Sequence, residues 1–270
     1  MKKIVVAIDF SRASRNASEY TASLAKLFHA ELLLVHAYKE LMPATMGPEP
    51  WSVMISKRTR LIESEMQYEI AFLKKKYGIQ VSGEISRGNK QNILKKAAED
   101  TGADMVVIGG KRVTGTSLFS FTIMKSIRKV NRPVLIVPED FKFGTPKNIV
   151  LAVDFTEKPE QRVINFLLEI VHTFDASLRV VNIERRGYTA SGAESEAKTD
   201  IGIYLAGVSY LYDQVEYKDV SEGIRQFTDT HPTDLLVMIA HSHSLFDQIS
   251  RRDPVMNAAF ETQFPLLVLK

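Results

Sequence analysis

The sequence contains no cysteine among its 270 residues. This absence excludes disulfide bonds, cysteine nucleophiles and thiolate metal ligands, and it is compatible with the cytoplasmic location that we expect. Long apolar runs are also missing. The run Ile4–Ile8 ends at Asp9 and is too short for a signal peptide or a membrane span. We therefore expect a soluble chain without a membrane partner.

The chain also has little excess of charge of one sign. Lysine and arginine together number 35 against 32 acidic residues, which gives a formal net charge of +3. The basic residues are interleaved with acidic ones, so we expect no nucleic acid partner. Hydrophobic residues make up 45% and charged residues 25%, as in ordinary globular proteins, and the length suits two domains.

Segments of the first half recur, in the same order, in the second half. Residues Lys3–Ser11 (KIVVAIDFS) recur as Asn148–Thr156 (NIVLAVDFT). Three further pairs follow: Ala30–Val35 with Ala176–Val181, Asp104–Ile108 with Asp234–Met238, and Pro133–Val137 with Pro265–Leu269. The offset falls from 145 (154 minus 9) to 130 (234 minus 104), so the second copy is shorter in its middle. The join at Pro138–Pro146 divides the chain into predicted domains 1–140 and 146–270.

Short, continuous Val, Ile and Leu runs alternate with helical patterns in the first copy. Such runs are typical of strands buried on both faces of a parallel sheet. The predicted strands are 3–8, 31–37, 79–86, 104–108 and 133–137, and the predicted helices are 12–28, 53–77, 89–101 and 118–130. Residues 40–52 carry three prolines and are predicted to be a connector, with a lid or a partner surface as the alternative.

The second copy is predicted to follow the same order, although its middle is ambiguous. Its predicted strands are 148–153, 178–183, 234–239 and 265–269, with a helix over 159–174. Residues 201–211 suit a helix, whereas 210–217 alternate as a third strand would. The pattern as a whole predicts the α/β class, with two tandem, doubly wound, five-stranded parallel-sheet domains. Ligands of such sheets bind beyond the carboxyl ends of the strands, where the strand order reverses.

Two motifs carry a resemblance to a known family. The first strand ends in Ala-x-Asp-x-Ser at Ala7–Ser11, and Asp104–Gly109 precedes a loop, a helix and Pro133–Pro138. Both resemble the universal stress proteins, and the resemblance occurs twice. It implies an adenine nucleotide alpha hydrolase-like, Rossmann-like fold with strand order 3-2-1-4-5 in each half. It also implies that the halves pair through their last strands about a pseudo-twofold axis, and it allows a homodimer of two tandem chains.

The resemblance also implies a nucleotide site in the first half. ATP-binding members of the family carry G-x-x-G, about nine residues and G-[ST], because glycine backbone approaches phosphate closely. Gly109 fits the first glycine, whereas Arg112 replaces the second and Ser120 and Phe121 stand at the final pair. In those members, the aspartate after the first strand lies near the ribose, and the end of the second strand lies near the adenine. The candidate residues are Asp9, Phe10, Ser11, Val35, Gly109, Gly110, Lys111, Arg112, Gly115 and Ser120.

Each of these residues also has a structural interpretation. Asp9 can accept hydrogen bonds from the amides of the next helix, and the glycines can serve a tight turn. Lys111 and Arg112 can either compensate for the lost glycines by their charge or belong to a solvated loop. The second half has no glycine in its equivalent loop, 239–245, so we expect that half not to bind ATP. His241 and His243 could contribute to a metal site or line a loop, and we expect no metal beyond a Mg²⁺ carried by the nucleotide.

Three functions are compatible with these features. The leading hypothesis is a non-catalytic stress-response protein whose first half binds ATP or another adenine nucleotide. The alternative is a nucleotide-independent module that binds protein partners, because both phosphate loops depart from the family pattern. The third, an enzyme that hydrolyses ATP slowly or transfers a nucleotidyl group, rests on fold analogy alone.

Overall fold

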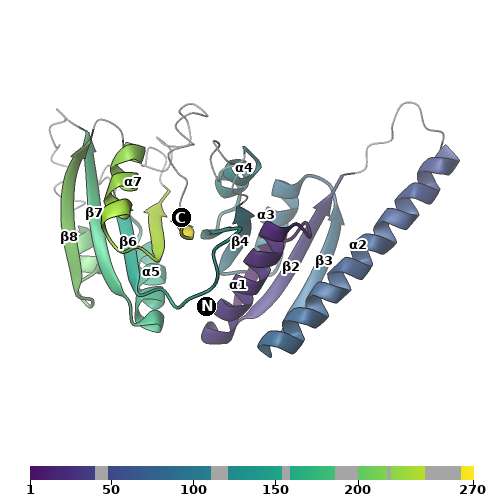
Figure 1. Ribbon diagram of the computed structural model, residues 1–270, viewed down its shortest axis with the longest axis horizontal. Coiled ribbons are helices and arrows are strands. Elements are labelled where there is room, and N and C mark those ends of the chain that lie inside the picture. Colours follow the sequence, from purple (N-terminus) through teal and green to yellow (C-terminus); the bar gives the residue numbers. More distant parts are fainter. Residues whose placement is uncertain (40–47, 111–120, 154–158, 186–199, 218–219, 241–262) are drawn as a thin grey trace.

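The computed structural model describes residues 1–39, 48–110, 121–153, 159–185, 200–217, 220–240 and 263–270. A single ten-stranded sheet runs through the molecule, with helices on both faces (Figure 1). The strands are β1 (Lys3–Ala7), β2 (Glu31–Tyr38), β3 (Val81–Arg87), β4 (Met105–Gly110), β5 (Val134–Pro138), β6 (Asn148–Val153), β7 (Ser177–Arg185), β8 (Tyr210–Tyr217), β9 (Leu235–Ile239) and β10 (Leu266–Leu269). The helices are α1 (Arg12–Phe28), α2 (Pro48–Tyr77), α3 (Lys90–Asp100), α4 (Phe121–Lys129), α5 (Gln161–Phe174) and α7 (Val220–Thr230).

The strand order is β3-β2-β1-β4-β5-β10-β9-β6-β7-β8. Within each half all neighbouring strands are parallel, so the predicted order 3-2-1-4-5 is confirmed in the first half. The second half repeats this order in the reverse direction across the sheet. Among the described strands, the one antiparallel pair is β5 with β10; it joins the halves, so the last strands pair within one chain. None of the helices in the described ranges is long and apolar enough to cross a membrane.

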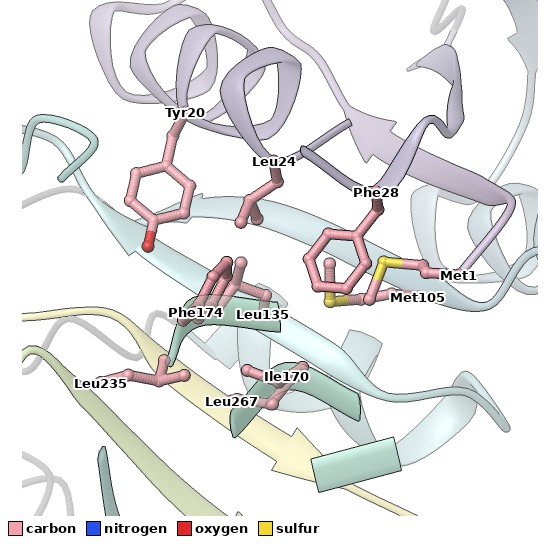
Figure 2. A pocket seen from close by; sticks show the side chains of 10 residues that line it. All are labelled: Met1, Tyr20, Leu24, Phe28, Met105, Leu135, Ile170, Phe174, Leu235 and Leu267. Carbon is pink, nitrogen blue, oxygen red and sulfur yellow. The ribbon is translucent and has the colours of Figure 1, made fainter. Parts of the chain in front are cut away.

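The core is built on both faces of this sheet because the central strands are buried on both sides. On one face, α1 and α5 meet at the join, where the rings of Phe28 and Phe174 lie edge to face with centroids 5.7 Å apart. Between them a small apolar cavity of about 20 Å³ is lined by side chains of both halves (Figure 2). On the other face, α3, α4 and α7 cover the same strands. On each face of the sheet the core therefore runs through both halves.

A lysine at the end of the chain also ties the two halves together. The ammonium group of Lys270, which follows β10, donates hydrogen bonds to the carbonyl oxygens of Ile127 and Val130. Ile127 lies in the last turn of α4 in the first half, and Val130 directly follows that helix. A cation at this place satisfies carbonyl groups that the helix leaves unpaired and is favoured by the helix dipole.

The structure differs from the predicted elements mainly at α2 and α7, and it resolves the ambiguous middle of the second half. Helix α2 begins at Pro48 rather than at residue 53, because proline in the first turn loses no helical hydrogen bond. Residues 48–52, predicted as part of a connector, therefore belong to the helix. The ambiguous middle of the second half contains both elements, with residues 200–204 helical and Tyr210–Tyr217 forming β8. Helix α7 was not predicted.

Candidate functional site

The candidate site lies where the strand order reverses, at the carboxyl ends of β1 and β4. These strands are neighbours, with Ala7 opposite Ile108. The three candidates Asp9, Phe10 and Ser11 lie in the turn between β1 and α1, one residue after the end of β1, and Gly109 and Gly110 end β4. The structure thus brings five of the candidate residues to one edge of the sheet. Lys111, Arg112, Gly115 and Ser120 lie outside the described residues, as do His241 and His243.

The Asp9 carboxylate is held by the turn between β1 and α1. Its Oδ1 accepts hydrogen bonds from the backbone N–H and the hydroxyl of Ser11, at 3.1 and 2.5 Å. Its Oδ2 lies 3.8 Å from Nζ of Lys90, the first residue of α3. Burial raises the pKa of Asp9, but the hydrogen bonds from Ser11 and the charge of Lys90 outweigh it and hold the pKa below 3.8. The carboxylate is therefore ionised at neutral pH, and its side chain is 51% exposed.

Ser11 serves α1 as well as Asp9. It is the N-cap of the helix, and its hydroxyl accepts a hydrogen bond from the backbone N–H of Ser14 at 3.3 Å. The geometry therefore agrees with the structural interpretation of this turn, because Asp9 and Ser11 organise the start of α1. The half-exposed carboxylate of Asp9 nevertheless remains accessible at the edge of the sheet.

Phe10 has an unusual backbone conformation. Its φ is 61°, in the left-handed region that bulky residues rarely adopt. Arg15 stabilises this conformation: its Nε donates a hydrogen bond to the Phe10 carbonyl at 3.1 Å, and its guanidinium carbon lies 5.8 Å from the Phe10 ring centroid. The turn directs the Phe10 ring onto the ring of His36, with centroids 4.9 Å apart and an interplanar angle of 25°. Strained backbone held in this way is a common feature of functional sites.

His36 was not among the predicted site residues. It is buried on β2, between Phe10 and Tyr38, and its ring lies nearly parallel to that of Tyr38 at 6.4 Å. Phe10, His36 and Tyr38 thus form a row of three rings, here called the ring row. The available sequence signal for His36 was its spacing of two residues from Tyr38, because alternate residues share one face of a strand.

The protonation of His36 follows from its surroundings. Its Nδ1 lies 2.8 Å from the carbonyl oxygen of Ile8. A carbonyl only accepts, so Nδ1 donates its hydrogen there, and Nε2 of the neutral ring is an acceptor. Burial is the largest influence and lowers the pKa of His36 below 6.5, although the Ile8 carbonyl and Asp9 oppose it. The ring is therefore neutral at pH 7.

Gly109 is required by packing. A Cβ at this position would lie 2.4 Å from the carbonyl oxygen of Ala13, in the first turn of α1. That distance is far inside van der Waals contact, so only glycine lets α1 approach β4 this closely. The glycine is therefore explained without a phosphate. Its neighbour Gly110 is buried, and its carbonyl accepts a hydrogen bond from the Glu139 amide at 2.9 Å.

Val35 lies in the core. Its side chain is 1% exposed on β2 and packs with the face covered by α3. Its carbonyl oxygen accepts a hydrogen bond from the Ile8 amide at 3.0 Å. The side chain therefore contributes to the packing beneath the site.

The aspartates of the repeated Asp104 and Asp234 motifs act at the opposite edge of the sheet. Oδ2 of Asp104 accepts a hydrogen bond from the Lys3 amide at 2.9 Å, at the start of β1. Oδ2 of Asp234 accepts one from the Asn148 amide at 2.8 Å, at the start of β6. Both are structural. Among the described residues no group of three or more acidic or histidine side chains is arranged to hold a metal ion.

Comparison with known proteins agrees with this architecture. The profile of the universal stress protein family matches residues 1–138. A universal stress protein of Methanocaldococcus jannaschii is 27% identical over 148 residues, which cover 52% of this chain and 84% of the relative. The profile thus matches the first half of the chain, and the relative is a shorter protein than this one.

Two solved structures resemble the chain over its whole length. A universal stress protein from Archaeoglobus fulgidus superposes with a TM-score of 0.70 at 14% identity and covers 99% of this chain and 96% of its own. A putative universal stress protein from Pseudomonas aeruginosa superposes with a TM-score of 0.59 at 13% identity and covers 100% and 93%. At such identities the likeness concerns the fold. With the profile match over half of its length, the chain belongs to the universal stress protein family.

Proposed function

We propose that the first half binds an adenine nucleotide at the carboxyl ends of β1 and β4, and that the second half is structural. The observation that carries this proposal is the ring row beside the half-exposed Asp9 carboxylate. An aromatic surface and a fixed anionic acceptor at a strand-order reversal suit a nucleoside. The protein would act in the stress response as a non-catalytic nucleotide-binding protein.

The chemistry of these residues fits the nucleoside part of such a ligand. Aromatic rings stack on bases, and each base–ring contact contributes about 1–3 kcal/mol. The ionised Asp9 is suited to accept hydrogen bonds from ribose hydroxyls, since its side chain is 51% exposed and its Oδ2 lies 3.8 Å from the ammonium of Lys90. Lys90 would add a positive charge for the phosphates. Lys111 and Arg112 would supply further charge from the loop after β4.

A second candidate is supported by a separate observation. Gly109, the residue that best matches the family's phosphate loop, is explained by the approach of α1 to β4. A protein that had lost nucleotide binding would keep this glycine for packing alone. The second candidate function is therefore a nucleotide-independent module that binds protein partners.

Calorimetric titration of the purified chain with ATP, ADP, AMP and adenosine separates the two. A denatured sample is first analysed for nucleotide that co-purified with the protein. The proposal expects binding at one site per chain, with adenosine retaining part of the affinity because the ring row and Asp9 contact the nucleoside. If no compound binds and no nucleotide is released, the interaction module replaces the proposal.

A further inference from the structure

Helix α2 is only partly packed against its own chain. It has 30 residues and covers β3 and one side of α1 with its C-terminal half, where Ile62, Met66 and Leu73 are buried. Its first half diverges from the sheet at the outer end of the molecule (Figure 1). There even the residues that continue the buried face, Trp51 and Ile55, are half-exposed. A helix this long thus offers a free side along much of its length.

That free side carries an apolar stripe. Met54, Leu61 and Tyr68 are each seven residues apart and are 38, 67 and 64% exposed. Seven residues make almost two helical turns, so the three side chains line one side of α2. Phe72 extends the line: its ring is nearly parallel to that of Tyr68, with an interplanar angle of 8° and ring centroids 6.4 Å apart. We call these four residues the α2 stripe.

The stripe is unusual for a surface helix. Single exposed apolar side chains are normal, but a continuous line of large ones on a monomeric protein marks an interaction surface. The spacing of seven is the one that lets two helices pack along each other, because each such residue returns to the same seam. A second helix with the same period is therefore the partner that this surface fits.

The charges beside the stripe indicate which helix this is. On the N-terminal side of Leu61 lie Lys57, Arg58 and Arg60, and on its C-terminal side lie Glu63 and Glu65. All five are exposed. If a second α2 runs antiparallel with Leu61 on the twofold axis, Met54 faces Tyr68 and Lys57 faces Glu65 of the other copy. Glu65 is half-exposed, and its Oε2 also binds Arg15 of its own chain. Parallel packing would place like charges together and is disfavoured.

We infer that two copies of this chain pair through antiparallel α2 helices, with Leu61 at the centre of the interface. The inference does not rest on nucleotide binding, because the α2 stripe contains none of the candidate site residues. The resulting homodimer leaves the β5–β10 join untouched, since that pair is already formed inside each chain. Each chain would thus contribute its own paired halves to the dimer.

The absence of native cysteine allows a direct test by disulfide cross-linking of the full chain. Leu61→Cys places both thiols at the twofold axis. Val53→Cys is the matched control, because Val53 is 55% exposed on the same helix but outside the stripe. At micromolar protein we expect Leu61→Cys to form covalent dimers about 100-fold faster than Val53→Cys, because a dimer holds paired thiols at millimolar effective concentration. Equal rates for the two variants overturn the inference.

Two further measurements fix the direction and the contribution of the stripe. Mixing Met54→Cys with Tyr68→Cys should give mixed disulfide dimers in preference to dimers of either variant with itself. Preferential dimers of Met54→Cys with itself overturn the antiparallel arrangement.

In sedimentation at micromolar concentration, Leu61→Glu should lower the average mass towards that of one chain, 30.4 kDa. Glutamate suits an exposed helix position, so the fold is kept. An unchanged mass overturns the inference.

Discussion

Leu135 of β5 lies directly opposite Leu267 of β10 in the antiparallel pair that joins the two halves. The two leucines occupy equivalent positions in the repeated segments Pro133–Val137 and Pro265–Leu269. Both are buried and both line the small central cavity (Figure 2). The pseudo-twofold axis that relates the halves therefore passes between these two side chains, in the middle of one shared core.

The join should consequently be a main source of stability. Leu267→Ala removes buried methyl groups beside an existing cavity and should lower the free energy of unfolding by about 2–5 kcal/mol. Urea unfolding followed by circular dichroism measures this loss. Leu211→Ala on the edge strand β8 is the control, because Leu211 is 59% exposed and its loss should cost at most about 0.5 kcal/mol. Equal losses in the two variants would contradict a shared core.

The packing role of Gly109 gives a second prediction. Gly109→Ala forces a Cβ against the Ala13 carbonyl and should destabilise the fold by about 1–3 kcal/mol, even without any ligand. Gly144→Ala is the matched control, because a Cβ there meets no atom within 4 Å. Thermal unfolding of both variants without nucleotide provides the measurement. An unchanged Gly109→Ala protein would leave phosphate approach as the reason for this glycine.

A buried carboxyl between α1 and α2 predicts a pH dependence of stability. Glu69 is 2% exposed, and its Oε2 accepts a hydrogen bond from Arg15 at 2.6 Å. Within the part of the chain that the structure describes, its Oε1 has no hydrogen-bond partner. Burial is the largest influence and raises the pKa of Glu69 above 4.5, and the charge of Arg15 only partly opposes it. The folded chain therefore binds this proton more tightly than the unfolded chain.

The sign of the effect follows by linkage. Protonation of Glu69 favours the fold fully below about pH 4.5, and this stability is lost as the pH rises through the raised folded pKa. Relative to Glu69→Gln, the wild-type chain should thus lose stability as the pH rises from 4.5. Urea unfolding of both proteins between about pH 4.5 and 8 tests this, with the exposed Glu63→Gln as control. A constant difference between wild type and Glu69→Gln across that range would refute it.

The sequence was most informative where one local pattern determines the structure. Strands such as Lys3–Ala7 and Met105–Gly110 could be predicted because continuous apolar runs have few alternatives to a buried parallel strand. The start of α2 at Pro48 was missed because prolines usually mark connectors, and only the first turn of a helix tolerates them. The pairing of β5 with β10 came from the family resemblance, since no local pattern specifies which strand an edge will meet.

The candidate site was predictable in place but not in detail. Asp9 and Ser11 could be located because a strand end followed by a helix cap has a recognisable sequence. The role of His36 depends on the left-handed turn at Phe10, which brings a ring from one strand end over another. Likewise, the contact between Gly109 and Ala13 joins residues far apart in the sequence. Neither contact has a local sequence signal; the spacing of His36 and Tyr38 indicates only that these two residues share one face of β2.

The most direct test of the proposed nucleotide site compares two aspartate variants in calorimetric titration with ATP. Asp9→Asn removes the ionised acceptor at the switch point between β1 and β4, and removing one such charged hydrogen bond should weaken binding about 10- to 100-fold. Asp175→Asn is the control, because Asp175 lies after α5 with φ of 48°, a conformation that asparagine adopts readily. The account predicts that wild type and Asp175→Asn bind alike and that Asp9→Asn binds more weakly. Equal affinities in all three proteins, or no binding to the wild type, would contradict it.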